Sequence, residues 1–371
     1  MYKTAIRSLI KRKFSSADIY LNGNRPWDLQ VYNDQFFSTV FYQGSLGLGE
    51  AYMDGWIDAQ HLDETIHRIV MNKIGETSSL SLFIHSISPL IFNKQSKRRS
   101  LEVAKKHYDL SNTLFQSMLD RRMTYSCGYW THAKSLDEAQ EAKLELVCKK
   151  LYLEPGMRVL DIGCGWGSFA KYAAERYGVE VVGVTISREQ LELAKKMCKG
   201  LPVDLRLQDY REINEPFDRV VSIGQMEHVG HKNYKTYMKM VHQCLPESGI
   251  FLLHTIGSNV STVYTDPWIN KYIFPNGMLP SLAQLTSAAE KLFVVEDVHN
   301  FGSHYDKTLM AWFKNFDQNW PMLKADYDER FYRMWKYYLL TCAGAFRGRQ
   351  LQLWQIVLSK NGISGGYTTF R

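Results

Sequence analysis

The segment VLDIGCGWGSFA, residues 159–170, decides the fold class. An apolar run ends at Asp161, glycines follow at positions 163, 165 and 167, and a helical pattern begins after them. Glycine at such positions lets the backbone turn sharply and approach a ligand, while the N-terminus of the following helix faces the same crevice. The spacing DxGxGxG fits the loop that binds S-adenosylmethionine better than the GxGxxG of dinucleotide-binding folds, so NAD is the weaker alternative.

Predicted strands and helices alternate along the chain around this glycine loop. The apolar runs expected to be strands are 158–163, 179–185, 203–208, 218–224, 250–257, 293–300 and 351–360. The accompanying helical patterns are 137–153, 167–177, 189–198, 234–245 and much of the aromatic-rich stretch 307–347. This alternation predicts a parallel, doubly wound sheet.

The N-terminal part of the chain has a different pattern. Short extended runs at 18–23 and 29–33 precede a glycine-rich stretch at 45–56, which we interpret as turns. These signals predict a small N-terminal α/β domain over residues 1–80. A linker over 81–100 and a catalytic domain over 101–371 complete the predicted organisation.

The linker contains an apolar run followed by a basic one. Residues 80–92 place apolar side chains at helical spacing, and NKQSKRR follows at 93–99. Apolar followed by basic is a pattern of membrane-surface segments. The alternative is an interdomain helix that is interrupted at Pro89.

Composition narrows the classes of protein to consider. The chain has 371 residues, 45% hydrophobic, a net charge of +7 and five basic but no acidic side chains among the first thirteen. Its six cysteines form no CxxC pair, no secretory apolar core opens the chain and no run approaches the roughly 18 apolar residues of a membrane span. We expect a cytoplasmic protein with reduced thiols that contacts a membrane, if at all, at its surface.

Polar residues after the second and third strands are candidates for adenosine recognition. The second strand offers Thr185, Ser187 and Gln190 in place of the acid that often grips the ribose. The third strand is followed by Gln208 and Asp209. Asp209 lies where the adenine edge is expected, and the alternative is that it only caps a helix.

Several longer motifs carry a resemblance to a known family. They are KHYDLSN (106–112), YSCGYW (125–130), EHVGHKNY (227–234), LLHTIGS (252–258), DPWINKYIFPNG (266–277), HNFGSHYDKTLMAW (299–312) and CAGAFRGRQLQLWQ (342–355). With the glycine loop, they make nearly the whole chain resemble the cyclopropane fatty acid and mycolic acid cyclopropane synthases. The resemblance implies the fold of class I S-adenosylmethionine-dependent methyltransferases, an α/β fold with a Rossmann-like, seven-stranded, mostly parallel sheet and helical insertions that cover the substrate.

The resemblance also implies an activity. It is the transfer of a methylene group from S-adenosylmethionine across the cis double bond of unsaturated acyl chains in phospholipids at the bilayer surface. Attack of the alkene on the methyl group leaves a carbocation, and ring closure then needs a base that does not trap it. In the family that base is a bound bicarbonate. The resemblance also implies a cytoplasmic protein that is peripherally associated with the inner face of the membrane. It leaves open whether the protein forms a homodimer.

Two other functions compete with this one. A related lipid C-methyltransferase would share the carbocation but deliver a methyl branch in place of a ring. A nucleic-acid methyltransferase is supported only by the basic segments, and the chain lacks the N/D-P-P-Y/F stretch that base amino-methyltransferases carry after the fourth strand. We therefore expect no nucleic-acid partner.

The resemblance assigns site residues position by position. The bicarbonate holders would be Cys127, Glu227, His254 and Tyr305, with His228 supporting Glu227. Cys342 is a further candidate that only a covalent mechanism would need. The implied cofactor-binding residues are Tyr125, Ser126, Asp161, Gly163, Gly165, Gly167, Thr185, Ser187, Gln190, Gln208 and Asp209.

Plainer alternatives remain open for these residues. Cys127 could be a small buried apolar side chain, His254 a hydrogen-bonded core histidine and Cys342 a thiol in a helix core. A metal site built from Glu227, His228, His231 and His254 is weakly supported because HxxH on a loop is a poor signal, and we expect no metal. The residues that depart from the family's motifs are Gly128, Ser168, Gln225 and Met226.

Overall fold

The computed structural model describes residues 2–74 and 111–371. The predicted linker over 81–100 and most of the motif at 106–112 lie outside these residues. The chain forms two compact units, which we describe separately. The helical unit comprises the described residues of Met1–Phe92 with Tyr264–Pro275 and Tyr305–Leu351, and the sheet unit comprises those of Asn93–Val263 with Asn276–His304 and Gln352–Arg371.

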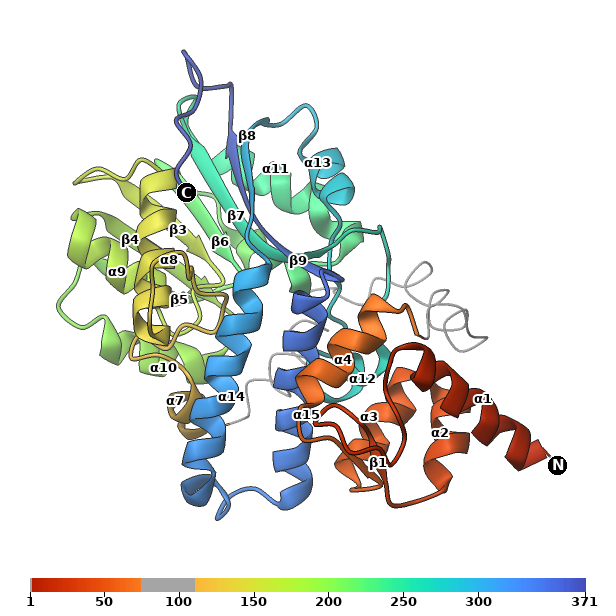
Figure 1. Cartoon of the computed structure of the whole chain (residues 1–371). Helices are drawn as coiled ribbons and strands as arrows, with labels where there is room; N and C mark the ends of the chain where they lie inside the picture. Colours follow the sequence, from red (N-terminus) through yellow and green to blue (C-terminus); the bar gives the residue numbers. More distant parts are fainter. Residues whose placement is uncertain (1, 75–110) are drawn as a thin grey trace. The chain divides into compact units, whose positions relative to one another are not determined.

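The sheet unit is built on seven strands in the order β5-β4-β3-β6-β7-β9-β8 (Figure 1). The strands are β3 (Arg158–Ile162), β4 (Glu180–Thr185), β5 (Val203–Leu207), β6 (Arg219–Ile223), β7 (Ile250–Ser258), β8 (Val294–Asn300) and β9 (Leu351–Ser359). The pairs β3–β4, β4–β5, β3–β6 and β6–β7 are parallel, and β8 is antiparallel to β9. All seven predicted strands and the mostly parallel sheet are thus confirmed.

Helices accompany these strands. They are α7 (Asn112–Met118), α8 (Leu136–Lys150), α9 (Ser168–Tyr177), α10 (Arg188–Met197), α11 (Tyr234–Cys244) and α13 (Leu282–Ala289), with short 3₁₀ turns η1 (Tyr210–Glu212), η2 (Met226–His228) and η3 (His231–Asn233). Helices α8, α9, α10 and α11 lie at the predicted places, whereas α7 and α13 were not predicted. Serine side chains cap four of these helices: Ser111 accepts from a backbone N–H of α7, Ser135 from one of α8, Ser187 from one of α10 and Ser281 from one of α13. Such caps satisfy N–H groups that have no partner within the helix, so the chain specifies where these helices begin.

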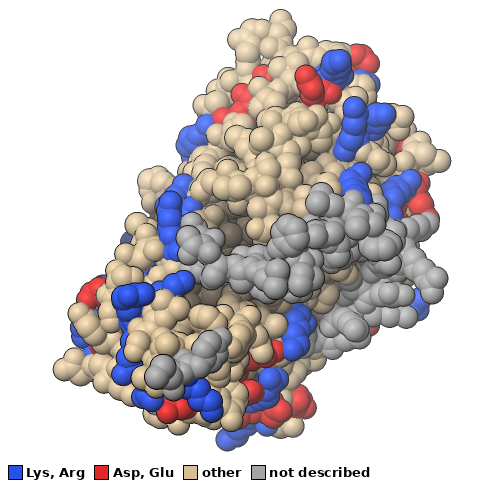
Figure 2. All heavy atoms as spheres, turned by 90° about the vertical axis from the view of Figure 1, so that its right-hand side faces the viewer, with Lys and Arg blue, Asp and Glu red and all other residues tan. Residues whose placement is uncertain are grey.

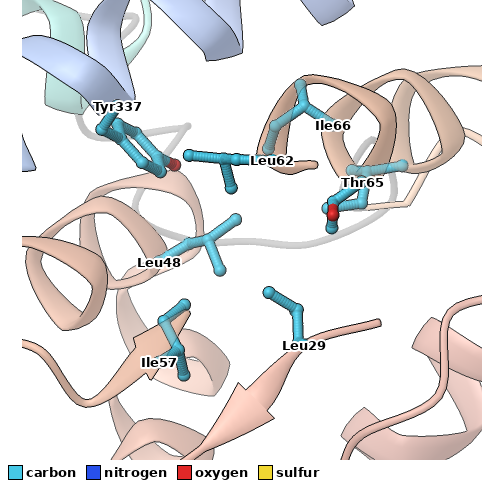
Figure 3. A pocket seen from close by; sticks show the side chains of 8 residues that line it. Leu29, Leu48, Ile57, Leu62, Thr65, Ile66 and Tyr337 are labelled. Atoms are coloured by element: carbon cyan, nitrogen blue, oxygen red, sulfur yellow. The ribbon is translucent and has the colours of Figure 1, made fainter. Parts of the chain in front are cut away.

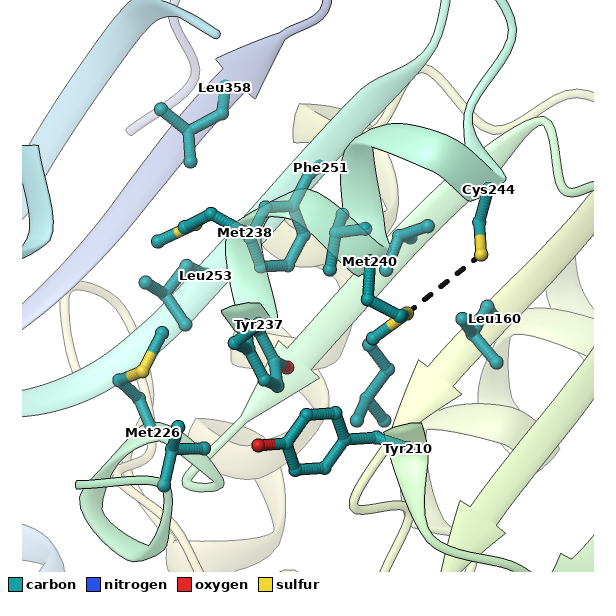
Figure 4. Close-up of a cluster of buried hydrophobic side chains, with 14 of the residues drawn as sticks. Leu160, Tyr210, Met226, Tyr237, Met238, Met240, Cys244, Phe251, Leu253 and Leu358 are labelled. Carbon is teal, nitrogen blue, oxygen red and sulfur yellow. Dashed lines mark hydrogen bonds between the residues drawn. The ribbon is translucent and has the colours of Figure 1, made fainter. Parts of the chain in front are cut away.

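The two-residue period of the strands divides the core between the two faces of the sheet. Val159 packs with α8 and α9, through side chains such as Leu144 and Phe169. Leu160 faces the opposite side, where Tyr237 of α11 belongs to the same cluster (Figure 4). Because alternate side chains of a strand point to opposite faces, one apolar strand can support helices on both sides.

The helical unit holds most of its residues in α-helices. Its elements are α1 (Tyr2–Ser16), β1 (Gln30–Val31), α2 (Gln35–Gln43), α3 (Ser45–Met53), β2 (Ile57–Asp58), α4 (Leu62–Met71), α12 (Pro267–Tyr272), α15 (Glu329–Arg347) and nearly all of α14 (Ser303–Leu323). The predicted N-terminal α/β domain therefore contains one pair of two-residue antiparallel strands among helices.

The prediction that residues 45–56 are turns is wrong, because Ser45–Met53 forms α3. The glycines of this stretch permit close packing instead. A Cβ atom on Gly47 would lie 2.5 Å from the Thr39 carbonyl oxygen, and one on Gly49 would lie 2.3 Å from the Trp268 ring. Here glycine marks a close helix contact and not a turn.

Helix α15 joins segments that are distant in sequence within the helical unit. A Cβ atom on its Gly344 would lie 2.5 Å from the Asp63 carbonyl oxygen of α4, so the two helices touch at their backbones. Arg347 binds Asp63 over 2.8 Å and Asp306 over 3.0 Å. Residues 305–351 are therefore grouped with N-terminal helices, while the domain boundaries expected from sequence stay a prediction.

A small pocket inside the helical unit is apolar (Figure 3). Its lining comprises Leu29, Leu48, Ile57, Leu62, Thr65, Ile66, Ile69 and Tyr337. The Thr65 hydroxyl is hydrogen-bonded to the Trp27 carbonyl oxygen over 2.8 Å. We assign the pocket to core packing. Within the described parts of the chain, no helix is both long and apolar enough to cross a bilayer.

We predict that Gly257→Ala destabilises the sheet unit. A Cβ atom on Gly257 would lie 1.9 Å from a carbon of the Trp354 six-membered ring, so the ring or the β7 backbone must move. The free energy of unfolding should fall by about 1–3 kcal/mol, the usual cost of overpacking a core. Chemical denaturation followed by circular dichroism measures it.

The control for this prediction is the same substitution in a Trp354→Phe background. Phenylalanine lacks the fused ring that the added methyl group would meet, so Gly257→Ala should cost less there. An equal cost in both backgrounds would show that the clash is not with Trp354.

Candidate active site

The glycine loop follows β3 directly and has the predicted backbone conformation. Gly163, Gly165 and Gly167 have φ values of +80°, +54° and +80°, in the left-handed region that disfavours side chains. No described atom lies within 4 Å of where a Gly165 Cβ would sit, whereas a Gly163 Cβ would be 2.5 Å from Oε1 of Gln225. The loop thus leaves room beside Gly165 and is closed by Gln225 next to Gly163.

Asp161 is buried near the end of β3. Its side chain is 2% exposed, and Oδ2 has no hydrogen-bond partner among the described residues. Burial raises the pKa of this carboxyl from 3.8 to about 7, although nearby Lys143 opposes the shift. A buried carboxyl oxygen without a partner costs free energy unless a ligand or water satisfies it.

The polar residues after β4 form a local network. The Ser187 side chain caps α10 by accepting from the Gln190 N–H over 3.3 Å, and the Thr185 hydroxyl lies 3.3 Å from Oε1 of Gln190. All three side chains are buried. The network fixes their orientation, and their contact with a cofactor stays a prediction.

The residues after β5 lie beside this network. The Gln208 N–H donates to the Thr185 carbonyl oxygen over 3.0 Å, which brings the ends of β4 and β5 together. Asp209 accepts from the Arg211 N–H over 3.0 Å and so caps η1. The structure bears out the capping alternative for Asp209, and its role at an adenine ring is a prediction.

The segment around Tyr125 and Ser126 is held from α8. Gln140 donates to the Ser126 carbonyl oxygen over 2.7 Å, and Lys143 donates to the Ser126 hydroxyl oxygen over 2.9 Å. The Tyr125 ring packs edge-on against Phe115, with ring centroids 5.1 Å apart. The sequence did not single out Gln140 or Lys143, since both lie in an unremarkable amphipathic helix.

Two of the residues that depart from the family's motifs have local explanations. The Ser168 hydroxyl lies 2.7 Å from the Thr124 hydroxyl, so it ties the start of α9 to the Tyr125 segment. A Cβ atom on Gly128 would lie 2.9 Å from Cβ of Ala139, so the backbone passes close to α8 at this point.

Glu227 is buried in η2, just beyond the end of β6. Its Oε1 accepts from the Ile256 N–H of β7 over 2.7 Å, while Oε2 has no partner among the described residues. Burial raises the pKa of Glu227 from 4.5 to about 7, and the hydrogen bonds to the carboxyl only partly offset this. The site thus holds a carboxyl group that is both positioned and half unsatisfied.

His254 lies in β7, two residues before the partner of Glu227. It pairs with Ile223 at the end of β6, and its side chain is 1% exposed. Burial, together with Lys143 and Lys150, holds the pKa of His254 well below 6.5, so the ring is neutral. The Gln355 amide nitrogen lies 3.3 Å from Nδ1, which places the ring proton on Nε2.

Glu227 and His254 together offer a small polar ligand an acceptor and a donor. Nε2 of His254, like Oε2 of Glu227, is buried and without a partner in the described chain. The two groups are chemically compatible with a planar oxyanion that carries one O–H, since a carboxylate can accept the O–H and a neutral imidazole can donate to an oxygen. The chemistry of the two groups therefore fits bicarbonate.

The other two residues expected to hold bicarbonate, Cys127 and Tyr305, belong to different units. Cys127 is fully buried in the sheet unit, and its thiol donates to the Gly128 carbonyl oxygen over 3.2 Å. It interacts electrostatically with Lys143, which in turn acts on His254. Tyr305 belongs to the helical unit, where its ring lies 4.6 Å from that of Phe346. Its membership of the anion site stays a prediction.

His228 and Cys342 are both held in their neutral forms, and their roles at the site stay predictions. Burial lowers the pKa of His228 to about 4, so its imidazole is neutral at physiological pH. In α15, burial raises the pKa of the Cys342 thiol to about 12, which disfavours the reactive thiolate. Within residues 2–74 and 111–371, no three His, Cys, Asp or Glu side chains are grouped as a metal centre requires.

The chain is similar to known proteins over most of its length. The family model described as Mycolic acid cyclopropane synthetase matches residues 95–356. The cyclopropane-fatty-acyl-phospholipid synthase of Escherichia coli (strain K12) is 52% identical over 361 residues, which are 96% of this chain and 94% of that protein. A probable fatty acid methyltransferase of Pseudomonas putida is 36% identical over 335 residues, 86% of this chain and 83% of that one.

A solved structure agrees with these matches. The mycolic acid cyclopropane synthase CmaA1, in a complex with SAH and CTAB, is 34% identical. It superimposes with a TM-score of 0.66 and covers 70% of this chain and 98% of its own.

We predict that Glu227→Gln makes the protein more stable at alkaline pH. The pKa of Glu227 is about 7 in the folded chain against 4.5 ordinarily, so the folded state binds more protons between these values. The free energy of unfolding of the unsubstituted protein therefore falls as the pH rises through this window. The Gln side chain cannot ionise. Relative to the unsubstituted protein, the variant should therefore gain about 1–3 kcal/mol in free energy of unfolding as the pH is raised from 5 to 8.

Denaturant unfolding at both pH values measures this difference, with Glu180→Gln as the control. Glu180 is exposed at the start of β4, so its substitution should shift stability equally at the two pH values. A stability gain of Glu227→Gln that does not vary with pH would contradict a buried, ionising carboxyl.

Proposed function

The chain belongs to the mycolic acid cyclopropane synthetase family, and we propose that it adds a methylene group to the cis double bond of unsaturated acyl chains in membrane phospholipids. Membership makes it an S-adenosylmethionine-dependent methyltransferase of lipids. The observation that carries the phospholipid assignment is 52% identity over 96% of the chain to a cyclopropane-fatty-acyl-phospholipid synthase.

The residues of the glycine loop fit S-adenosylmethionine as the cosubstrate. When bound, it supplies the activated methyl group. The open side of Gly165 and the unpartnered Oδ2 of Asp161 offer such a ligand close backbone approach and a polar partner. Thr185 and Gln208 then line the side on which its adenosine part would lie.

We propose that a bicarbonate ion is the base. It would take the proton that ring closure releases. Glu227 would accept its O–H and so fix its orientation, while Nε2 of His254 donates to one of its oxygens. Neither side chain needs to act as the base itself, which suits a buried carboxyl with a pKa of about 7 and a neutral imidazole. Cys127, which belongs to the same unit, would complete this anion site, and the role of Tyr305 remains an expectation from the sequence.

A bilayer surface is the partner we propose for the helical unit. The exposed side of α1 carries Lys3, Arg7, Lys11 and Arg12, and the helix contains no acidic residue. Its apolar residues Ile6, Ile10 and Phe14 are buried in the unit. Figure 2 shows one face of the molecule, on which basic and acidic side chains are interspersed. The local basic cluster on α1 would attract anionic lipid. We propose that the protein lies in the cytoplasm and binds to the inner face of the membrane.

The activity is tested with phospholipid vesicles and S-adenosylmethionine. The expected product is a phospholipid heavier by one CH₂ that has lost its alkene signal and shows upfield cyclopropyl protons by NMR. Vesicles of fully saturated phospholipid are the control. An unsaturated product with a methyl branch would establish the second candidate, a lipid C-methyltransferase, and absence of any product would refute both.

The same assay tests the base. Turnover should fall in CO₂-free buffer and return when bicarbonate is added. Glu227→Gln should reduce turnover by about 10²- to 10⁴-fold, the usual contribution of acid–base catalysis, with binding of S-adenosylhomocysteine unchanged. Full turnover without bicarbonate would refute bicarbonate as the base, but it would not contradict the proposed methylene transfer.

We predict that charge removal from α1 weakens vesicle binding. Replacing Lys11, Arg12 and Lys13 by Gln should weaken binding to anionic vesicles by about 10- to 100-fold at low salt, since each basic residue near such a surface contributes about 1 kcal/mol. Vesicle co-sedimentation measures this. Lys195, Lys196 and Lys199, exposed in and beside α10, give a matched control with the same change of charge. Equal losses for both sets would show that only net charge matters.

A further inference from the structure

Lys143 is a buried lysine that reaches the cofactor side of the sheet unit from α8. Its side chain is 1% exposed, and Nζ donates to the Ser126 hydroxyl oxygen over 2.9 Å. Burial of an ammonium group is costly, and an apolar side chain of similar length would fill the space without that cost. Lys143 lies outside all the motifs that carry the family resemblance, so its burial needs an explanation of its own.

The surroundings of Lys143 show what it holds. Gln140, one helical turn earlier, donates to the carbonyl oxygens of Ser126 over 2.7 Å and Thr124 over 3.4 Å. One face of α8 therefore binds the backbone of this segment through an amide and its side chain through a cation. Cys127, one of the expected anion holders, is the next residue along the chain.

The hydrogen bond from Lys143 determines the direction of the Ser126 hydroxyl. An ammonium group has no lone pair, so Oγ of Ser126 must accept, and its own proton points elsewhere. Across the described chain, the Ser126 hydroxyl makes no other hydrogen bond that could take this proton. A hydroxyl that accepts from a cation is polarised and becomes a stronger donor. Ser126 thus presents a directed donor.

Electrostatics keep Lys143 charged and within reach of the anion site. Burial lowers the pKa of Lys143 to about 8, opposed by Asp120, Cys127 and Asp161, so the side chain is protonated at neutral pH. Lys143 also contributes, after burial, to the low pKa of His254. The cation therefore acts on residues from both the cofactor loop and the anion site.

Building on the proposed function, we propose that Lys143 is a positioning residue of the reaction. Its ammonium group fixes the Ser126 hydroxyl as a donor toward an oxygen acceptor of bound S-adenosylmethionine. Lys143 itself does not touch the reacting atoms. Its loss would leave Ser126 free to turn its proton toward the protein, so cofactor affinity would fall.

The chain offers a matched control on the same helix. Lys150, seven residues later, is 0% exposed and its pKa is also lowered to about 8. It lies 3.5 Å from Asp297 and 3.1 Å from His299, and it too acts on His254. Lys150→Met therefore removes a buried cation and its long-range field without touching Ser126.

The test is calorimetric binding of S-adenosylhomocysteine to the full chain. Lys143→Met should raise the dissociation constant by about 10- to 100-fold, the usual effect of a charge-assisted hydrogen bond, and Lys150→Met by less than about 2-fold. Ser126→Ala, a small change that preserves the fold, should reproduce most of the loss. The Lys143→Met and Ser126→Ala double variant should bind within about 2-fold of Lys143→Met, because the two side chains act as one unit.

Two results would overturn the proposal. Equal losses for Lys143→Met and Lys150→Met would show a general effect of a buried charge, and additive losses in the double variant would show that Lys143 does not act through Ser126. The binding test does not require turnover. If the protein made no cyclopropane product, the proposed function would be refuted, but the binding measurements would still decide whether Lys143 positions Ser126.

Discussion

The burial of four ionisable side chains behind one edge of the sheet is the constraint on which the site depends. Asp161, Lys143, Glu227 and His254 are each at most 8% exposed. Burial raises the pKa values of the two carboxyls, lowers that of the lysine and keeps the imidazole neutral. In an environment from which water is excluded, each hydrogen bond is electrostatically stronger. Each buried polar atom without a partner costs free energy unless a ligand or a water molecule binds it. The spare oxygen of Glu227 and the spare nitrogen of His254 are therefore the two atoms on which the proposed anion site rests.

The architecture of the sheet brings these groups together. Parallel pairing puts the ends of β3 and β6 at one edge, so the glycine loop and η2 are neighbours, and Gln225 closes against Gly163. β7 runs beside β6 and delivers both His254 and the Ile256 N–H that anchors Glu227. Helix α8 then fixes the Ser126 segment from behind. Thus regular elements carry three of the four ionisable groups, Asp161, Lys143 and His254, and the short turn η2 carries the fourth, Glu227.

Much of this arrangement follows from the sequence, for identifiable reasons. The central strands could be predicted because both faces of a parallel sheet are covered, which makes strands such as β4 and β7 largely apolar runs, while the edge strands β5 and β8 carry charged residues. The turn at Gly163, Gly165 and Gly167 could be predicted because a left-handed backbone strongly favours glycine. The glycines of α3 failed as turn signals because the same residue also serves close helix packing, which depends on partners such as Thr39 and Trp268 elsewhere in the chain. Lys143 was missed because helical periodicity does not distinguish a solvated lysine from one buried against Ser126.

The make-up of the helical unit bears on how the chain folds during synthesis. Helix α4 ends at Met71, but α15, which packs on it through Gly344 and Arg347, begins only at Glu329. At the usual pace of translation, roughly 5–20 residues per second, α4 waits about 10–60 s for its partner. During that time the whole β3–β7 part of the sheet unit can emerge and pair. Helix α4 is therefore completed late, and apolar side chains such as Ile66, which α15 covers in the folded chain, stay uncovered in the meantime.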